Sequence, residues 1–314
     1  MTVLKDISRE ARNLAAVFEA TGAEVVELDF LQISNVLLDL YGEDIRGRAF
    51  ITNDPVHGEM MLRPDFTIPI VERHMANNVS PARYTYSGKV FRRQEEFPDR
   101  PREFLQVGYE IFDGANPEKA DAEVFSLVNE ALSGIQVRIA TGDIGILMAA
   151  VRSLSTTDTR KKALLRHIWR PHRFRTLLNQ YSGLSSKPQP NQDLDDYNKL
   201  LDKFQAVGSR KVQEIKERLR QIKLESETDP LDPEEVKILD ELLSLKDKCT
   251  VAHSHLENLS KKMPGIESTV DNFATRLDFL KKNGIKIERL DFEGSYGRTS
   301  MEYYLSLIHI SEPT

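Results

Sequence analysis

A strand-like segment, residues 104–114, carries the side chains best suited to chemistry. Its sequence, FLQVGYEIFDG, alternates, so that one face is large and apolar while the other carries Gln106, Gly108 and Glu110. Such alternation is typical of a β-strand whose two faces meet different surroundings. An amide and a carboxylate on either side of a glycine can hold a small polar ligand against the backbone. Solvent on that face explains the same pattern, so both interpretations stay open at this point.

A second strand-like segment, residues 82–94, supplies further groups for such a site. Five residues share one of its faces: Tyr84, Tyr86, Gly88, Val90 and Arg92. If this face adjoins the polar face of 104–114, two glycines open a floor between Arg92, Gln106 and Glu110. Carboxylates bind an ammonium group, whereas arginines and amides bind a carboxylate or phosphate. The two strands together therefore favour a site for a zwitterion.

The elements that must position these strands alternate between strand pairs and helices. Helices are expected around residues 11–21, 30–42, 65–77, 117–133, 144–154 and 269–283, and strands over 24–29, 48–52, 59–63, 82–94, 102–112, 135–143 and 285–292. Pro117 and the acidic residues after it are typical of a helix start, and Gly134 of a helix end. Strand pairs followed by helices favour an α+β fold with an antiparallel sheet over a doubly wound parallel one.

The chain changes character between about residues 157 and 263, which are predicted to form a highly charged helical insertion. Within it, the basic stretch 160–175 contains Trp169 and Phe174 between its arginines and lysines. Basic residues interleaved with aromatic ones can contact RNA phosphates and bases. Two other interpretations are open: the aromatic residues face the core, or the stretch meets an acidic partner.

Composition excludes several classes of protein. A net charge of −6 gives the chain as a whole no electrostatic attraction to nucleic acid or to an anionic membrane. No apolar run approaches the roughly 20 residues that cross a bilayer. Cys249 is the only cysteine, so no disulfide forms within the chain, and neither a metal site nor a cofactor loop is recognisable. We expect a cytoplasmic protein without a cofactor or metal.

The last ten residues, LSLIHISEPT at 305–314, continue none of the preceding pattern. They resemble the translation of a sequencing-library adapter, and we expect them to be a non-native tail. The core is therefore predicted to span residues 1–304, and the natural protein is expected to continue past Tyr304.

Four motifs in order carry a family resemblance: LRPDFT, YSGKVFRRQ followed by RPREFLQVGYEIFDG, GDIGIL and GRTSMEYY. Together they resemble the class II catalytic core of histidyl-tRNA synthetase. They are more similar to its paralogue, the regulatory subunit of ATP phosphoribosyltransferase. The resemblance extends from about residue 8 to Tyr304 and is weakest across the helical insertion. It implies a class II synthetase-like antiparallel sheet flanked by helices.

Departures from the synthetase pattern separate the two relatives. The synthetase form LRPEGT is replaced by LRPDFT, and the glutamate that helps to hold ATP is replaced by Gln94. The opening RGT-x-D element is absent, and the tyrosine-containing loop 298–304 is one residue longer. The resemblance nevertheless implies a retained set of histidine-binding residues: Asp65, Thr67, Arg92, Gln106, Glu110, Arg298, Tyr303 and Tyr304. In that set Glu110 and Asp65 are expected to hold the ammonium group of histidine.

A chain that keeps the histidine-binding residues and lacks part of the ATP-binding residues suits a histidine sensor. The resemblance implies a non-catalytic regulatory subunit, which joins a short-form catalytic subunit in a hetero-oligomer and mediates feedback inhibition by histidine. Self-association is expected, whereas a nucleic-acid partner is not. Two alternatives remain: a fragment of a true histidyl-tRNA synthetase, and a class II paralogue that serves only as a binding scaffold.

Overall fold

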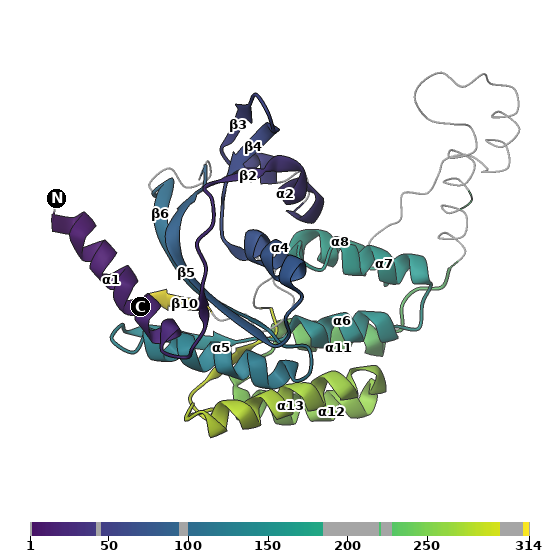
Figure 1. The fold of residues 1–314 in the computed structure, drawn as a ribbon. Coiled ribbons are helices and arrows are strands. Elements are labelled where there is room, and N and C mark those ends of the chain that lie inside the picture. Colours follow the sequence, from purple (N-terminus) through teal and green to yellow (C-terminus); the bar gives the residue numbers. More distant parts are fainter. Residues whose placement is uncertain are drawn as a thin grey trace, which may run out of the picture. The chain divides into compact units, whose positions relative to one another are not determined.

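The computed structural model describes residues 2–41, 45–93, 100–184, 220, 228–295 and 310–313. Within these ranges the chain separates into two compact units (Figure 1). Unit 1 contains residues 1–140, 272–290 and 309–314, and unit 2 contains residues 141–271 and 291–308. Each unit is described by itself.

The centre of unit 1 is a long antiparallel hairpin made of β5 (Ala82–Phe91) and β6 (Glu103–Phe112). The short strand β1 (Glu24–Val25) pairs with β5 in the parallel direction, which gives the strand order β1-β5-β6. The alternation in the sequence thus predicted both strands of the hairpin. The expected strand 24–29 is wrong in length, because only its first two residues pair.

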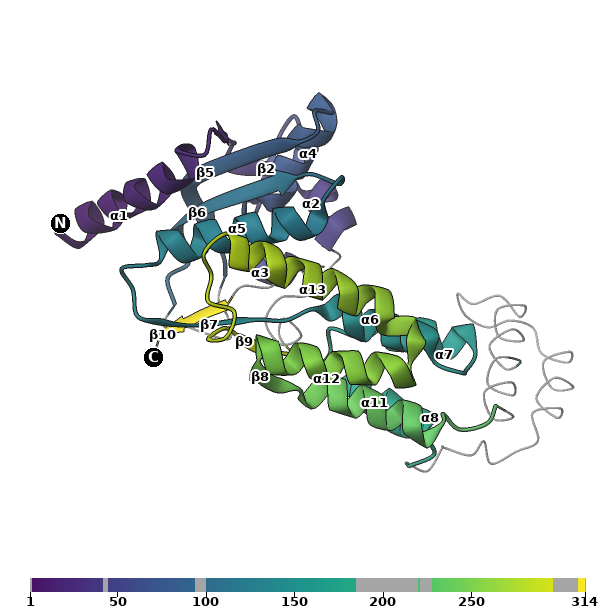
Figure 2. The ribbon, with the colours of Figure 1, turned by 90° about the horizontal axis from the view of Figure 1, so that it is seen from below.

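Both faces of this hairpin are covered by helices. Helices α1 (Thr2–Glu19) and α5 (Pro117–Ala131) pack on one face, where Phe18, Ala23 and Tyr109 form a buried cluster. Figure 2 shows α5 running beside β6. On the opposite face, residues of β5 pack against Phe66, which directly precedes α4 (Thr67–Asn77), and Ile70 within α4. The whole buried cluster consists of Val26, Phe66, Ile70, Tyr84, Tyr86 and Val90. The polar face is therefore an interior face for much of its length.

A smaller antiparallel sheet leads the chain into α4. Its strand order is β2-β4-β3, formed by β2 (Leu31–Ile33), β4 (Gly58–Leu62) and β3 (Ile51–Asp54). Helices α2 (Ser34–Tyr41) and α3 (Ile45–Arg48) lie between β2 and β3 in sequence. The helix expected over 30–42 therefore begins four residues later than predicted, because Leu31–Ile33 pair with Met60–Leu62 instead.

The remaining elements of unit 1 come from distant parts of the sequence. Strand β7 (Val137–Thr141) pairs with β10 (Ile310–Pro313) in antiparallel register. Helix α13 (Glu267–Lys282) begins in unit 2 and ends in unit 1, where Arg276 forms an ion pair with Asp121 of α5 at 3.1 Å. Strand β10 lies in the segment 305–314, whose non-native origin stays a prediction.

Unit 2 is mainly helical. Its helices are α6 (Ile144–Ser153), α7 (Asp158–Arg166), α8 (Pro171–Tyr181), α11 (Pro233–Ser244), α12 (Cys249–Lys262) and the 3-10 turn η1 (Pro264–Ile266). Asp232 caps α11, because its carboxylate accepts a hydrogen bond from the Glu234 N–H at 2.7 Å. Phe174 of α8 is 1% exposed, so the alternative that the aromatic residues of 160–175 face the core is confirmed for Phe174. Strands β8 (Lys246–Lys248) and β9 (Asp291–Glu293) form a short antiparallel pair.

One expectation for this part of the chain differs from the structure, and another stays a prediction. The strand predicted over 285–292 is wrong: residues 286–290 form successive turns, with Arg289 N–H bonded to Lys286 O at 2.9 Å, and pairing begins only at β9. The boundaries of the helical insertion, 157–263, stay a prediction. Its described residues are helical apart from turns and β8, and its buried Arg160 donates hydrogen bonds to the carbonyls of Thr228 and Asp229.

Candidate functional site

The hairpin register brings the two polar faces together. Directly opposite one another lie Tyr84 and Glu110, Tyr86 and Gly108, and Gly88 and Gln106. Side chains of directly opposed residues emerge on the same face of an antiparallel pair. The prediction that the polar face of 82–94 adjoins that of 104–114 is therefore confirmed.

Three of the predicted site residues are joined by hydrogen bonds. The Thr67 N–H donates to the Asp65 carboxylate at 3.1 Å, and the Thr67 hydroxyl donates to Glu110 Oε1 at 3.0 Å. Asp65 and Thr67 lie at the entry to α4, because Pro64 and the Asp65 turn end β4 and allow a helix to begin at Thr67. The loop after β4 and the centre of β6 thus present two carboxylates to one place.

The electrostatics of Glu110 are those of a buried acid. The pKa of Glu110 is raised to about 7: burial raises it most, the nearby Asp65 carboxylate also raises it, and the Thr67 hydrogen bond lowers it. A carboxylate in these surroundings needs either a proton or a positively charged partner. The site therefore favours a ligand that brings a cation, such as an ammonium group.

The floor between the glycines is filled by the protein itself. A Cβ atom at Gly108 would lie 2.2 Å from the ring of Tyr86, and one at Gly88 would lie 2.7 Å from the Arg63 guanidinium and 2.9 Å from Phe66. The expectation of an open floor is wrong, because the two glycines leave room for these side chains. Phe66 stacks on Tyr86 with ring centroids 4.3 Å apart.

Arg63 is a site component that the sequence prediction left out. Its guanidinium lies 3.9 Å from the centre of the Phe66 ring and 4.8 Å from that of Phe30. It donates hydrogen bonds to Lys89 O at 2.9 Å and to Leu28 O. Burial lowers the pKa of Arg63, and the Asp29 carboxylate partly opposes this effect. Its position in the LRPDFT motif, two residues before Asp65, could have identified it, because a cation there can orient the loop that carries Asp65.

Gln106 and Arg92 complete the described part of the site. The Gln106 amide oxygen is buried and has no hydrogen-bond partner in the described part of the chain. Buried polar atoms are normally paired, so a donor supplied by a ligand would satisfy this oxygen. Arg92 donates through Nε to Pro64 O at 2.8 Å, and its guanidinium lies 5.3 Å from the centre of the Phe104 ring. Arg92 thereby ties the end of β5 to the loop that carries Asp65.

The other predicted residues, Arg298, Tyr303 and Tyr304, lie outside the described residues, as does Gln94. The structure thus brings together Asp65, Thr67 and Glu110 through hydrogen bonds, with Gln106 on the same strand as Glu110 and Arg92 directly after β5. Across the described ranges, no three histidine, cysteine, aspartate or glutamate side chains are grouped to hold a metal ion. No helix in those ranges is long and apolar enough to span a membrane.

Comparison with known proteins decides the family. The family model described as histidyl-tRNA synthetase matches residues 3–292. Two curated relatives bear the name ATP phosphoribosyltransferase regulatory subunit. The protein of Rhizobium rhizogenes is 29% identical over 97% of this chain and 86% of its own length, and that of Rhizobium etli is 30% identical over 95% and 84%. The chain belongs to the ATP phosphoribosyltransferase regulatory subunit family.

Solved structures show the same fold. A protein of Bacillus halodurans, described as an ATP phosphoribosyltransferase regulatory subunit/histidyl-tRNA synthetase, superposes with a TM-score of 0.68 at 18% identity. That match covers 100% of this chain and 70% of the other. A histidyl-tRNA synthetase of Nostoc sp. PCC 7120 gives 0.61 at 15% identity, over 98% and 61%. These matches confirm the predicted α+β, class II synthetase-like fold of this family member.

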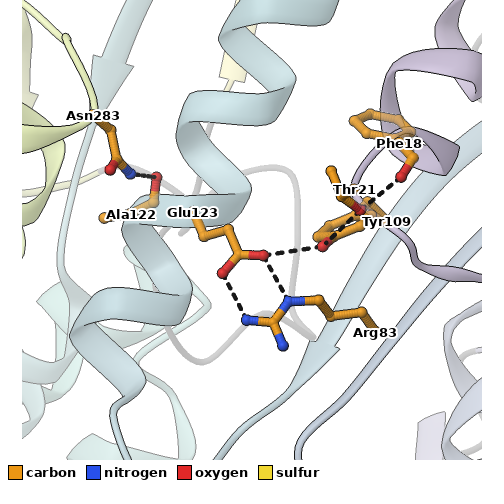
Figure 3. A network of polar contacts seen from close by, with 7 residues as sticks. All are labelled: Phe18, Thr21, Arg83, Tyr109, Ala122, Glu123 and Asn283. Carbon is orange, nitrogen blue, oxygen red and sulfur yellow. Dashed lines mark hydrogen bonds and ion pairs between the residues drawn. The ribbon is translucent and has the colours of Figure 1, made fainter.

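In this regulatory-subunit fold, the reverse face of the hairpin holds a separate polar network (Figure 3). Arg83 donates two hydrogen bonds to the Glu123 carboxylate, at 2.7 and 2.8 Å. The Tyr109 hydroxyl donates to the same carboxylate at 3.0 Å, and the Thr21 hydroxyl donates to Tyr109 at 3.3 Å. The Arg83 ion pair lowers the pKa of Glu123. The network joins β5 and β6 to α5 and to the end of α1. It therefore holds the two strands in place on the face opposite to the candidate site.

Substitutions at Gly108 and Tyr86 test whether the Tyr86 ring packs against Gly108. Gly108→Ala should destabilise the protein by about 1–3 kcal/mol, because the added methyl group overlaps the Tyr86 ring. The double variant Gly108→Ala/Tyr86→Leu should recover part of this loss in chemical denaturation. Gly114→Ala is the matched control, since nothing lies within 4 Å of its added Cβ. Equal stability of Gly108→Ala and Gly114→Ala would contradict the packing.

Proposed function

We propose that this chain is a non-catalytic, histidine-sensing regulatory subunit of ATP phosphoribosyltransferase, which acts in histidine biosynthesis in the cytoplasm. It binds free histidine at the site around Asp65, Thr67, Gln106 and Glu110. It joins a short-form catalytic subunit in a hetero-oligomer, activates phosphoribosyl transfer and transmits feedback inhibition by histidine. Self-association of the chain is part of the proposal. The names of the curated relatives support the assignment to this complex.

One observation carries the histidine part of the proposal. Glu110 is a mostly buried carboxylic acid that accepts a hydrogen bond from Thr67. A second acidic side chain, that of Asp65, lies nearby. Two acidic groups in a mostly buried site are costly to ionise unless a cation joins them. The α-ammonium of a free amino acid is such a cation, and the buried Gln106 oxygen can accept one further N–H donor.

Arg92 favours the regulatory interpretation over the enzymatic one. Its Nε atom is bonded to Pro64 O and its guanidinium lies against Phe104, so these contacts join Arg92 to the protein itself. In the synthetase pattern the arginine of this motif precedes a glutamate that helps to hold ATP, and the chain has Gln94 in its place. A site that holds an amino acid without activating it is what feedback regulation requires.

The second candidate is a histidyl-tRNA synthetase activity. It is favoured by the family model over residues 3–292 and by the descriptions of the matching structures. The two candidates predict different chemistry at the same site. A synthetase exchanges pyrophosphate with ATP in the presence of histidine, whereas a sensor binds histidine without exchange.

The test is reconstitution of the full-length natural protein with a short-form catalytic subunit. Formation of phosphoribosyl-ATP is measured with and without histidine, in wild type, in Glu110→Gln and in Glu103→Gln. Glu103 lies on the same strand but forms an exposed ion pair with Lys89, so it is the matched control. Wild type and Glu103→Gln should activate the catalytic subunit and transmit inhibition by histidine. Glu110→Gln should activate it and lose the inhibition.

Three outcomes would contradict parts of this proposal. Histidine-dependent pyrophosphate exchange at the rate of a synthetase would identify an enzyme. Inhibition that survives undiminished in Glu110→Gln would place the feedback site on the catalytic chain. Histidine binding without any effect on the partner would leave a scaffold, because coupling requires that a ligand bind two states with different affinities.

A further inference from the structure

The polar network of Figure 3 lies on the reverse face of the hairpin, at the level of Glu110. On the site face, Glu110 lies directly opposite Tyr84. Of the two opposed pairs that flank this one, the first contains Arg83 of β5 and the second contains Tyr109 of β6. Side chains alternate along a strand, so Arg83 and Tyr109 emerge on the face opposite to Glu110. They are its diagonal neighbours, one on each strand.

A single carboxylate, that of Glu123 on α5, joins these two neighbours. Arg83 binds it through two hydrogen bonds, at 2.7 and 2.8 Å, and the Tyr109 hydroxyl donates to it at 3.0 Å. Paired contacts between a guanidinium and a carboxylate fix the orientation of both groups as well as their distance. The side chains of Arg83 and Glu123 are 30% and 26% exposed, so solvent screens this pair less than one on an open surface. Glu123 therefore holds β5, β6 and α5 together at the level of Glu110.

The helix that carries Glu123 is itself anchored at the same turn. Asp121 forms an ion pair with Arg276 of α13 at 3.1 Å, and both side chains are mostly buried. The Asn283 amide donates to Ala122 O at 3.3 Å (Figure 3). The two residues directly before Glu123 are thus bound to other parts of unit 1. Because of these contacts, α5 can serve as a rigid support for the hairpin.

We propose that Glu123 is a positioning residue of the histidine site. It binds Arg83 and Tyr109 on the reverse face, and the backbone between them then holds the Glu110 carboxylate at the ligand. This inference rests on the proposed function, because it concerns how tightly the site binds histidine. The Glu110 carboxylate must lie within hydrogen-bond distance of both the Thr67 hydroxyl and the ammonium group of the ligand. Such a site requires its contact groups to be held within about 0.5 Å by a supporting set of packed and hydrogen-bonded residues.

The alternative is that Glu123 only stabilises the fold. Both roles predict a loss of stability when its carboxylate is removed, because Arg83 would keep a partly buried charge without its partner. Only the positioning role predicts that the loss of histidine affinity depends on Glu110. Substitutions that act through a common group are not additive, whereas independent ones are. A double-mutant cycle on histidine binding therefore separates the two roles.

The test measures histidine binding to the full-length natural protein by calorimetry at about pH 8, where Glu110 is ionised. The variants are Glu123→Gln, Glu110→Gln and the double variant. The matched control is Glu130→Gln, which makes the same change at an exposed position of the same helix. A milder variant, Tyr109→Phe, removes only the hydroxyl contacts and keeps the ring that packs on Phe18 with centroids 5.5 Å apart. It takes the place of Glu123→Gln in the cycle if circular dichroism shows that Glu123→Gln does not fold.

We expect Glu123→Gln to bind histidine at least about fivefold more weakly than wild type, at the low end of the coupling that is typical between sites. Tyr109→Phe should lose a smaller part of the affinity, because the Arg83 ion pair remains. The control Glu130→Gln should stay within about twofold of wild type. In the Glu110→Gln background, Glu123→Gln should change the remaining affinity by less than about twofold.

An equal loss of affinity in the wild-type and Glu110→Gln backgrounds would overturn the positioning role, since Glu123 would then act on the fold. Unchanged affinity in both Glu123→Gln and Tyr109→Phe would also overturn it and would leave the histidine site in place. A wild-type protein that binds no histidine would contradict the proposed function itself, and the positioning role would be lost with it.

Discussion

Replacing Glu110 by glutamine should weaken the binding of free histidine by at least about tenfold at about pH 8, where the wild-type side chain is ionised. The amide keeps the size of the side chain and can still accept the Thr67 hydrogen bond, but it carries no charge for the ammonium group. Loss of one partner of a buried charged hydrogen bond typically costs on the order of 2–5 kcal/mol. Isothermal calorimetry on the full-length natural protein measures the change.

The matched control for this experiment is Glu103→Gln, which removes a carboxylate from the same strand. Glu103 forms an exposed ion pair with Lys89, and exposed pairs contribute little to stability or to a distant site. Histidine affinity in this variant should match that of wild type. If Glu110→Gln binds histidine as tightly as Glu103→Gln does, Glu110 does not contact the ligand, and the site around Thr67 must be assigned another role.

Binding should also be linked to protons. Burial raises the pKa of Glu110 in the free protein, and an ammonium group beside the carboxylate would lower it again. Histidine must therefore displace a proton from Glu110 below about pH 7, so that affinity rises with pH through this range. This contribution is absent in Glu110→Gln, and the difference between the two proteins separates it from the titration of the ligand's own imidazole.

The sequence was sufficient to predict the framework of this site. Strict alternation over 82–94 and 104–114 predicted two strands whose polar faces adjoin, whereas their register comes from the structure. The entry to α4 was predictable from Pro64 and Asp65, because a turn of this composition ends a strand and begins a helix. These features depend on the types and spacing of residues that are close together in the chain, which can be read directly from the sequence.

The filled floor could not be predicted in the same way. Whether a glycine leaves space for a ligand or for a neighbouring side chain depends on where Tyr86, Phe66 and Arg63 point. Tyr86 lies on β5, whereas Arg63 and Phe66 lie in the segment between β4 and α4. Gly108 alone fits both interpretations. The turns over 286–290 escaped prediction for a related reason: their alternating sequence is typical of a strand, but within the described ranges no strand pairs with them before Asp291.

The position of Arg63 has a consequence for the ligand site. It connects the carbonyls of Leu28 and Lys89 and stacks on Phe66, so the segment before β2, the strand β5 and the start of α4 are joined through one buried guanidinium. Asp65 and Thr67 follow Arg63 directly in the chain. Their carboxylate and hydroxyl are thereby held at fixed places relative to β6, which a pocket for a small ligand requires.

Glu110 should also make the ligand-free protein less stable as the pH rises. Its pKa is about 7 in the folded protein, whereas the ordinary value for a glutamate is 4.5, so between these values the folded state holds a proton that the unfolded state has lost. This contribution to stability is complete below the unfolded pKa and is lost as pH rises through the folded pKa. Integrated over the shift, the wild type loses on the order of 3 kcal/mol that Glu110→Gln, which has no acid to ionise, does not lose.

The Glu110→Gln substitution should therefore raise the stability of the ligand-free protein at high pH while it weakens the binding of histidine. In urea denaturation without histidine, Glu110→Gln should match wild type below about pH 4 and exceed it by up to about 3 kcal/mol at about pH 8. Saturating histidine should remove most of this difference, because the ammonium group stabilises the ionised wild-type carboxylate. Parallel pH profiles of the two proteins would show that Glu110 is not the titrating group. Glu110 would then lower the stability of the ligand-free protein and restore it when histidine is bound. Ligand binding explains this behaviour, because a carboxylate with a purely structural role would stabilise the ligand-free protein.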